Sequence, residues 1–317
     1  MKTFLRYVIA FWATIIAILT CLILIIAHKT SDEAYTLAQL DKMTMLDNPS
    51  RQPSIVLLGG SNVAFGFNSQ MIVDSIGMPV INTAVHAGLG LKYMMDECLP
   101  RLQHGHVLVF SPELASHFYG DTFYGNSEYA NMFYLGHVPP SEISSQQVRR
   151  IIELTPGYIF PKIIQPDFWL NRRGNTVYMR HHFNQYGDMV WHWTNDSTKH
   201  LNCSHPNNGN GKKLNLAACN DVVKALDALQ KRGIKVVMFS AGGDKVALSG
   251  LKKQYAEVVT FLQAHGYAYP DSTGLDLMDN DCTYDTEYHL SQKGATLHTL
   301  HLIAWLQQCG IHRPLTN

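Results

Sequence analysis

The stretch of chain that most clearly predicts the fold is residues 54–62, which read SIVLLGGSN. A short apolar run that ends at two glycines is typical of a strand buried inside a parallel sheet. Similar runs occur at residues 79–82, 106–110 and 234–239. Segments with helical patterning lie between or after these runs, at 90–102, 218–231, 251–265 and 291–308. Strands that alternate with helices predict an α/β fold whose parallel sheet is covered on both faces.

An uncharged segment near the N-terminus, residues 7–27, reads YVIAFWATIIAILTCLILIIA. As a helix it would extend about 31 Å, which matches a hydrocarbon core of about 30 Å. Lys2 and Arg6 precede it, and the positive-inside rule then predicts a cytoplasmic N-terminus and an exported body. A cleaved signal peptide is the alternative, but its apolar core is usually only about 7–15 residues long. We expect an uncleaved, single-pass anchor in the inner (cytoplasmic) membrane, with a periplasmic body.

The charge balance limits the classes of partner. The chain has 25 Lys and Arg residues against 25 Asp and Glu residues, so it lacks the basic surface that nucleic-acid binding needs. The 16 histidines are scattered singly, and no C-x-x-C pair occurs. We therefore expect neither a nucleic-acid partner nor a metal site, and no cofactor.

The cysteines leave the question of disulfides open. Five of the six fall in the expected exported body: Cys98, Cys203, Cys219, Cys282 and Cys309. Since five is odd, at least one thiol is free or pairs between chains, while an oxidising compartment allows two bridges. Cys203 and Cys219 are the pair closest in sequence, but sequence does not decide the pairing.

The chain divides into an anchor at residues 1–30, a linker at 31–53 and an α/β domain at 54–317. Between the third and fourth strands of this domain lies an insertion, residues 114–215. It is rich in aromatic residues, namely Phe118, Tyr119, Phe123, Tyr124, Tyr129, Phe133, Tyr134, Phe168, Trp169, Trp191 and Trp193. Loops over the carboxyl edge of a parallel sheet bind ligands, so exposed rings there are expected to stack on sugars. The alternative is that these rings fill a small satellite core.

Ser61 is the candidate nucleophile. It follows the first strand within the sequence GGSN, where a strand-to-helix turn would expose its hydroxyl above the sheet edge. The neighbouring glycines permit a tight turn and a close approach of substrate. A phosphate-binding loop is excluded because neither G-x-G-x-x-G nor a Walker pattern occurs here. An ordinary turn is the alternative.

A second candidate element, residues 285–294, reads DTEYHLSQKG and precedes the last expected helix. Asp285 and His289 are four residues apart, and Ser291 is placed to cap the helix. A histidine that takes a proton from a serine needs a neighbour that fixes its tautomer and stabilises the imidazolium ion. Asp285 is the expected partner, with Glu287 as the alternative. A capping loop with an incidental histidine would also explain the pattern.

Together the two elements resemble the SGNH (GDSL-like) hydrolase family over most of residues 54–310. The resemblance implies a three-layer, flavodoxin-like sheet with Ser61, Asp285 and His289 as catalytic residues. It further implies an oxyanion hole formed by the backbone amides of Ser61 and Gly88, since Gly88 follows the second strand. Asn62, Glu113, Trp191 and Trp193 are candidate substrate-binding residues.

This sequence departs from the family pattern in three places. Gly60 stands where the first block has an Asp, and the third strand leads into Ser111-Pro112-Glu113 without the usual Asn. The separation of Asp285 and His289 is four residues rather than three. These departures resemble the divergent, membrane-anchored branches of the family, which include O-acetylation proteins of alginate and cell wall and the D-alanyl transfer protein of teichoic acid synthesis. Residues 183–188, FNQYGD, also resemble a motif of such members, with no role that the sequence assigns.

The leading hypothesis is a membrane-anchored, extracytoplasmic serine esterase or O-acyltransferase that acts on an acylated carbohydrate of the cell envelope. The alternative is a catalytically weak binding or scaffold protein that works beside a membrane-bound O-acyltransferase or a polysaccharide exporter. A thioesterase or lipase is a third possibility, but the polar and aromatic insertion suits sugars better than an acyl chain.

Overall fold

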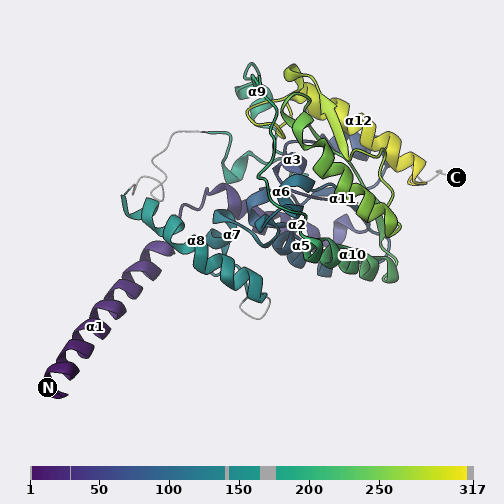
Figure 1. Ribbon diagram of the computed structural model, residues 1–317. Coiled ribbons are helices and arrows are strands. Elements are labelled where there is room, and N and C mark those ends of the chain that lie inside the picture. Colours follow the sequence, from purple (N-terminus) through teal and green to yellow (C-terminus); the bar gives the residue numbers. More distant parts are fainter. Residues whose placement is uncertain (1, 29, 140–142, 165–175, 313–317) are drawn as a thin grey trace.

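The computed structural model describes residues 2–28, 30–139, 143–164 and 176–312 (Figure 1). The helix α1 (Lys2–Ala27) projects from an α/β body. Within α1, Thr3–Ala27 has a mean hydropathy of 2.8 and is largely exposed except at Ala27, which is buried, so it is long and apolar enough to span a bilayer. A signal sequence would have the same properties. The expected apolar N-terminal helix is therefore confirmed, while its role as a retained anchor and the export of the body stay predictions.

The body is built on a parallel four-stranded sheet in the order β2-β1-β3-β4. The strands are β1 (Ile55–Leu58), β2 (Val80–Asn82), β3 (Val107–Phe110) and β4 (Lys235–Met238). In the register, Ile55 lies opposite both Val80 and Val107, and Val107 lies opposite Lys235. Every residue of β1, β2 and β3 is buried, so both faces of this part of the sheet are covered. The four predicted strands and their parallel pairing are confirmed.

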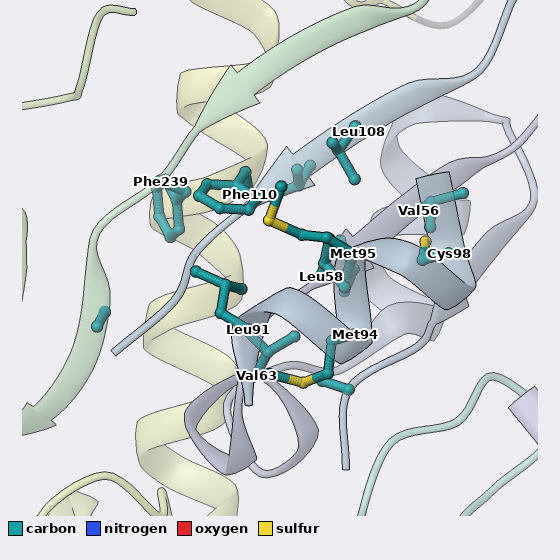
Figure 2. Packing of buried hydrophobic residues seen from close by; sticks show 14 of the residues in the cluster. Val56, Leu58, Val63, Leu91, Met94, Met95, Cys98, Leu108, Phe110 and Phe239 are labelled. Atoms are coloured by element: carbon teal, nitrogen blue, oxygen red, sulfur yellow. The ribbon is translucent and has the colours of Figure 1, made fainter. Parts of the chain in front are cut away.

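On one face of the sheet, apolar side chains of the strands pack against a helix (Figure 2). Alternate residues of a strand share a face, and Val56, Leu58, Leu108 and Phe110 point toward the same helix. That helix is α5 (Leu91–Cys98), which contributes Leu91, Met94, Met95 and Cys98. A fully buried side chain of this size contributes about 1.5–3 kcal/mol to stability.

The helices expected from the sequence are present with small shifts of their ends. The helical segments besides α1 and α5 are η1 (Tyr35–Leu37), α2 (Ala38–Asp47), η2 (Pro49–Arg51), α3 (Ser61–Ala64), α4 (Ser69–Ile76), η3 (Ala87–Leu89), η4 (Leu99–Arg101), α6 (Leu114–Phe118), η5 (Thr122–Tyr124), α7 (Ser127–Tyr134), α8 (Ser145–Ile164), η8 (Arg180–His182), α9 (His192–Asn195), α10 (Leu216–Lys231), η9 (Ala247–Leu251), α11 (Lys252–Ala264), η10 (Asn280–Cys282) and α12 (Gln292–Gln308). Those labelled η are short 3₁₀ turns. As expected, Ser291 caps α12, since its hydroxyl accepts the amide of Gly294 at 3.3 Å.

Two strands were not expected from the sequence. β5 (Ala241–Asp244) and β6 (Leu275–Met278) form a separate parallel pair. The sequence of β5, AGGD, reads as a turn because glycine and aspartate are poor strand formers. The strand is stabilised instead by its buried position, where every one of its residues is shielded from solvent.

Residues 31–53, expected to be a linker, are packed onto the body. Tyr35, Leu37 and Leu46 are part of the main hydrophobic core. The buried Lys42 on α2 donates hydrogen bonds to the carbonyl oxygens of Ala84 and Gly187. The segment therefore belongs to the folded body, because its apolar side chains are buried there.

The aromatic insertion is largely structural. Phe118, Tyr119, Phe123, Tyr124 and Tyr129 are buried in the main core rather than exposed to a ligand. This agrees with the alternative in which the rings act as filling, although they join the main core and not a satellite. Phe168 and Trp169 lie outside the described residues.

The six cysteines all fall among the described residues, and all six are free thiols. Cys203 and Cys219, the pair closest in sequence, form no disulfide. Cys98, Cys219 and Cys282 are buried, and burial raises the pKa of Cys98 to about 12 and that of Cys219 to about 12. These buried thiols act as small apolar side chains in the core.

The FNQYGD segment, residues 183–188, has a structural role that the sequence did not reveal. The buried Asp188 accepts hydrogen bonds from the amide of Ser69 at 2.9 Å and from its hydroxyl at 2.7 Å. It also accepts one from the side-chain amide of Asn82 at 2.9 Å. Asn82 is the last residue of β2, so the segment fastens the insertion to the carboxyl end of that strand.

Replacing Gly187 by alanine is expected to lower the free energy of unfolding by about 2–4 kcal/mol. Gly187 has a φ of +91°, and a Cβ there would collide with the carbonyl oxygen of Asn82. Gly136→Ala is the matched control, because Gly136 has a similar φ of +78° but open space around it. Denaturant unfolding of the detergent-solubilised chain measures both. Equal losses in the two variants would contradict the proposed close packing.

Candidate functional site

The turn that carries Ser61 lies at the carboxyl end of β1. Ser61 is the first residue of the short helix α3 and is 8 % exposed. The side chain of Asn62 supports the turn, because its oxygen accepts the Gly60 amide at 3.1 Å and its nitrogen donates to Ser111 O at 2.8 Å. With both polar ends engaged, Asn62 acts here as a support, and its contact with substrate stays a prediction.

Asp285 and His289 are brought together by a closed loop before α12. The amide of Tyr284 donates to the carbonyl oxygen of His289 at 2.7 Å, and the amide of His289 lies 3.2 Å from the hydroxyl of Thr286. Within this loop, Nδ1 of His289 is 2.7 Å from Oδ1 of Asp285. The separation of four residues thus allows the aspartate–imidazole pair predicted from the sequence.

Glu287, the alternative partner, points elsewhere. Its Oε1 accepts a hydrogen bond from the side-chain amide of Asn207 at 3.1 Å. Its backbone oxygen accepts the amide of Asp244 at 2.9 Å, which ties the loop to β5. In this geometry Asp285, and not Glu287, orients the imidazole.

Phe65 connects the serine turn with the histidine loop. It follows Ser61 by four residues and stacks on the ring of His289, with centroids 4.0 Å apart and planes inclined by 6°. The histidine loop therefore contacts the serine turn at a residue about one helical turn after Ser61. The hydroxyl of Ser61 does not bond to His289 among the described residues; it donates to Oε1 of Glu113 at 3.3 Å. Such contacts are often loose in enzymes without substrate and tighten on binding.

Glu113 lies three residues after β3, at the start of α6, in the segment where the SGNH pattern has an Asn. It is buried, and the same Oε1 that accepts the Ser61 hydroxyl also accepts the amide of Asn62 at 3.2 Å. A carboxylate there holds the serine turn in place. It lacks the N–H group with which an asparagine would stabilise an oxyanion.

The two backbone amides predicted to form the oxyanion hole differ in their hydrogen bonds. The amide of Ser61 donates to no acceptor in the part of the chain that the structure describes. The amide of Gly88, in η3, donates to Nδ1 of His86 at 3.0 Å. The predicted role of Gly88 therefore requires that the bond to His86 opens. His86 was not singled out from the sequence, and its position two residues before Gly88 was the available signal.

The two tryptophans predicted to bind substrate have different surroundings. Trp191 stacks on His182 with centroids 4.8 Å apart and packs against the main core. Trp193 lines a cavity of about 290 Å³ together with Lys199 and Tyr284. Tyr284 directly precedes Asp285, and Nζ of Lys199 is 4.0 Å from Oδ2 of Asp285, so this cavity adjoins the histidine loop. Only Trp193 thus stays well placed for the predicted contact with a ligand.

Tyr178 belongs to the site, although sequence reasoning missed it. Its hydroxyl donates to Oδ2 of Asp285 at 2.7 Å and lies 3.3 Å from Nδ1 of His289. Burial and then the bond to Asp285 raise the pKa of Tyr178, so it remains a neutral donor. Burial alone would raise the pKa of Asp285, but the hydrogen bond and the charge interaction with His289 outweigh burial and lower it. Asp285 is therefore a carboxylate at neutral pH.

Replacing Tyr178 by phenylalanine is expected to lower kcat by about threefold to tenfold, equivalent to about 1 kcal/mol, with little change in KM. The variant removes one donor from the Asp285 carboxylate but keeps the ring. Tyr284→Phe is the matched control, because the Tyr284 hydroxyl donates to Asp196 at 2.6 Å instead. Steady-state kinetics on an activated acetyl ester measure both. A larger effect from Tyr284→Phe would show that Tyr178 does not support the aspartate.

Comparison with protein-family models, with curated proteins and with solved structures gives no match. The resemblance to SGNH hydrolases therefore stays a prediction from the motifs. Among the described residues, no group of three or more His, Cys, Asp or Glu side chains is placed to hold a metal ion.

Proposed function

We propose that this protein is a membrane-anchored serine esterase or O-acyltransferase of SGNH type that acts on acylated carbohydrate outside the cytoplasmic membrane. The observation that carries the proposal is the Asp285–His289 pair, with Nδ1 to Oδ1 at 2.7 Å, stacked on Phe65 one turn from Ser61. Such a pair next to a serine at the carboxyl edge of a parallel sheet is an arrangement suited to acyl transfer. The flavodoxin-like, three-layer description of the body is part of this proposal.

In the proposed reaction, Oγ of Ser61 attacks the carbonyl carbon of an ester while Nε2 of His289 takes the hydroxyl proton. The negative charge on the carbonyl oxygen is stabilised by the amide of Ser61, joined by that of Gly88 once its bond to His86 opens. When the ester bond breaks, His289 returns the proton to the departing sugar oxygen, and an acyl-serine remains. Water or a second sugar hydroxyl then attacks the acyl-serine and gives its proton to His289; the bond from the acyl carbon to Oγ of Ser61 breaks, and His289 returns the proton to Oγ.

The carbohydrate substrate is inferred from the wall of the adjoining cavity. Trp193 and Tyr284 supply aromatic rings, while Lys199, Asp196 and His200 supply polar groups. Aromatic rings combined with several hydrogen-bonding groups suit a sugar better than an acyl chain. Burial lowers the pKa of His192, which also lines this cavity, to about 4, so its imidazole is neutral at physiological pH.

A scaffold function is the second candidate, and two contacts favour it. The hydroxyl of Ser61 bonds to the Glu113 carboxylate rather than to His289, and the amide of Gly88 bonds to His86. If these contacts persist with substrate bound, the nucleophile and one oxyanion donor are blocked. The protein would then bind an envelope glycan beside a membrane-bound O-acyltransferase and would not itself catalyse a reaction of that glycan.

A fluorophosphonate probe, which labels activated serines, tests the choice. We expect the solubilised full chain to be labelled and Ser61→Ala to lose the label. Ser127→Ala, at an exposed serine on the first turn of α7, is the control and should keep it. A parent chain that is not labelled, or labelling that survives Ser61→Ala, would favour the scaffold.

A further inference from the structure

The exposed surface of α8 is rich in large apolar side chains, while its charged residues Arg149 and Glu153 form an ion pair in the first half of the helix. Outside α1, nine large hydrophobic side chains are exposed among the described residues, and five of them are on α8: Val148, Ile152, Phe160, Ile163 and Ile164. Single exposed apolar residues need no explanation, but a cluster on one element marks a surface that something covers. Over residues 154–164 the only charged residue is Lys162, and it is buried. The last turns of α8 therefore expose almost no charge.

The end of α1 meets α8 at this apolar region. Nζ of Lys162 donates to the carbonyl oxygen of Ala27, the last residue of α1, at 3.1 Å, and the Tyr158 hydroxyl lies 3.0 Å from the same oxygen. Carbonyl groups in the last turn of a helix have no partner within the helix, and a cation there is favourable. Ala27, Tyr158 and Ile159 also form a small apolar cluster with Ile23. Specific polar and apolar contacts therefore hold the two helices together, and α8 lies crosswise to α1 (Figure 1).

We propose that the apolar face of α8 lies in the interfacial layer of the bilayer that α1 spans. A membrane span ends where hydrocarbon gives way to headgroups, and the contacts of Ala27 place α8 at that level. A helix that lies across the span end buries an apolar face into the boundary between headgroups and acyl chains. Lipid is the occupant that this geometry favours, because the face belongs to the helix that packs on the last turns of the apolar span.

The docking of α8 would hold the candidate site close to the membrane. Tyr35 follows Ala27 by eight residues, a length of chain that reaches at most about 28 Å. The ring of Tyr35 contacts the ring of Tyr178, with centroids 5.5 Å apart, and the hydroxyl of Tyr178 donates a hydrogen bond to Asp285. A substrate would then be a membrane-attached acyl donor or glycan. The docking of α8 rests on the proposed anchor alone, whereas the nature of the substrate rests on the proposed function as well.

Quenching by brominated phospholipid in vesicles that contain the full-length chain tests the proposal. Trp12 lies in α1 and reports on the anchor. Brominated lipid should reduce the emission of the parent by more than it reduces the emission of Trp12→Phe. In the Trp12→Phe background, Phe160→Trp should add emission that brominated lipid quenches to an extent comparable with Trp12. Ile163→Trp repeats the measurement at a second position of the face. Leu300→Trp is the control, an exposed apolar site on α12 at the far end of the body (Figure 1).

The outcomes separate the inference from the anchor on which it rests. If Trp12 is quenched but Phe160→Trp and Ile163→Trp are quenched no more than Leu300→Trp, the anchor stands and the docking of α8 is wrong. If emission from Phe160→Trp shifts to the blue without quenching, a protein covers the face, which also overturns the proposal. If Trp12 itself is not quenched, the anchor fails and the docking of α8 fails with it.

Discussion

Replacing Ser61 by alanine is expected to lower kcat/KM for a small acetyl ester by about 10⁴-fold or more. The proposed acyl-enzyme cannot form without the hydroxyl, and neither His289 nor Asp285 can substitute for it as the nucleophile. The effect on folding should be small, because the hydroxyl makes one hydrogen bond, to Glu113 at 3.3 Å, at a turn held by Asn62. Ester hydrolysis and thermal unfolding of the same preparation measure the two effects.

The control for this prediction is an exposed serine that the mechanism does not use. Ser127→Ala should leave turnover and thermal stability within error of the parent, because Ser127 lies at the surface of α7. Equal turnover by Ser61→Ala and the parent would remove Ser61 from the mechanism. A fall in both turnover and melting temperature would mean that the Ser61–Glu113 contact is structural, and Ser61→Cys, which retains a nucleophile, then separates the two roles.

The strands and the histidine loop were predictable because their signals are local. The residues of β1 form one apolar run that ends at glycines, and Asp285 and His289 lie on one short loop. By contrast, α8 was missed because Pro156 and Pro161 normally end a helix. The helix persists because Ile151, Tyr158 and Ile159 are buried against its neighbours, and this packing outweighs the lost hydrogen bonds.

The parts of the site that sequence did not reveal depend on contacts between distant residues. Tyr178 is 107 positions from Asp285, and no local pattern connects a tyrosine in the insertion with a loop before the last helix. The contact of Gly88 with His86 is local, but it concerns the direction of one N–H group, which depends on backbone angles that sequence does not specify. Sequence therefore provided Ser61, Asp285 and His289 as candidates, while the contacts of Tyr178 and Glu113 with them required the structure.

Replacing Asp285 by asparagine is expected to lower turnover by about 10²-fold to 10⁴-fold. The carboxylate accepts the proton of Nδ1, which leaves the lone pair of Nε2 free to take the proton of Ser61. An asparagine would donate its amide hydrogens to Nδ1 and so favour the tautomer that carries its proton on Nε2, where a base is needed. The imidazolium ion formed during the reaction would also lose its nearest negative charge.

Glu287→Gln is the matched control, since it removes one carboxylate from the same loop. Its Oε1 faces Asn207 and not the imidazole, so turnover should change by less than about tenfold. Both variants are measured on one activated ester across a range of pH, with melting temperatures to confirm folding. If Glu287→Gln is the more damaging variant, the pairing of Asp285 with His289 does not support catalysis. If both variants retain full turnover while Ser61→Ala does not, His289 acts without a carboxylate partner, and the 2.7 Å contact serves only to close the loop.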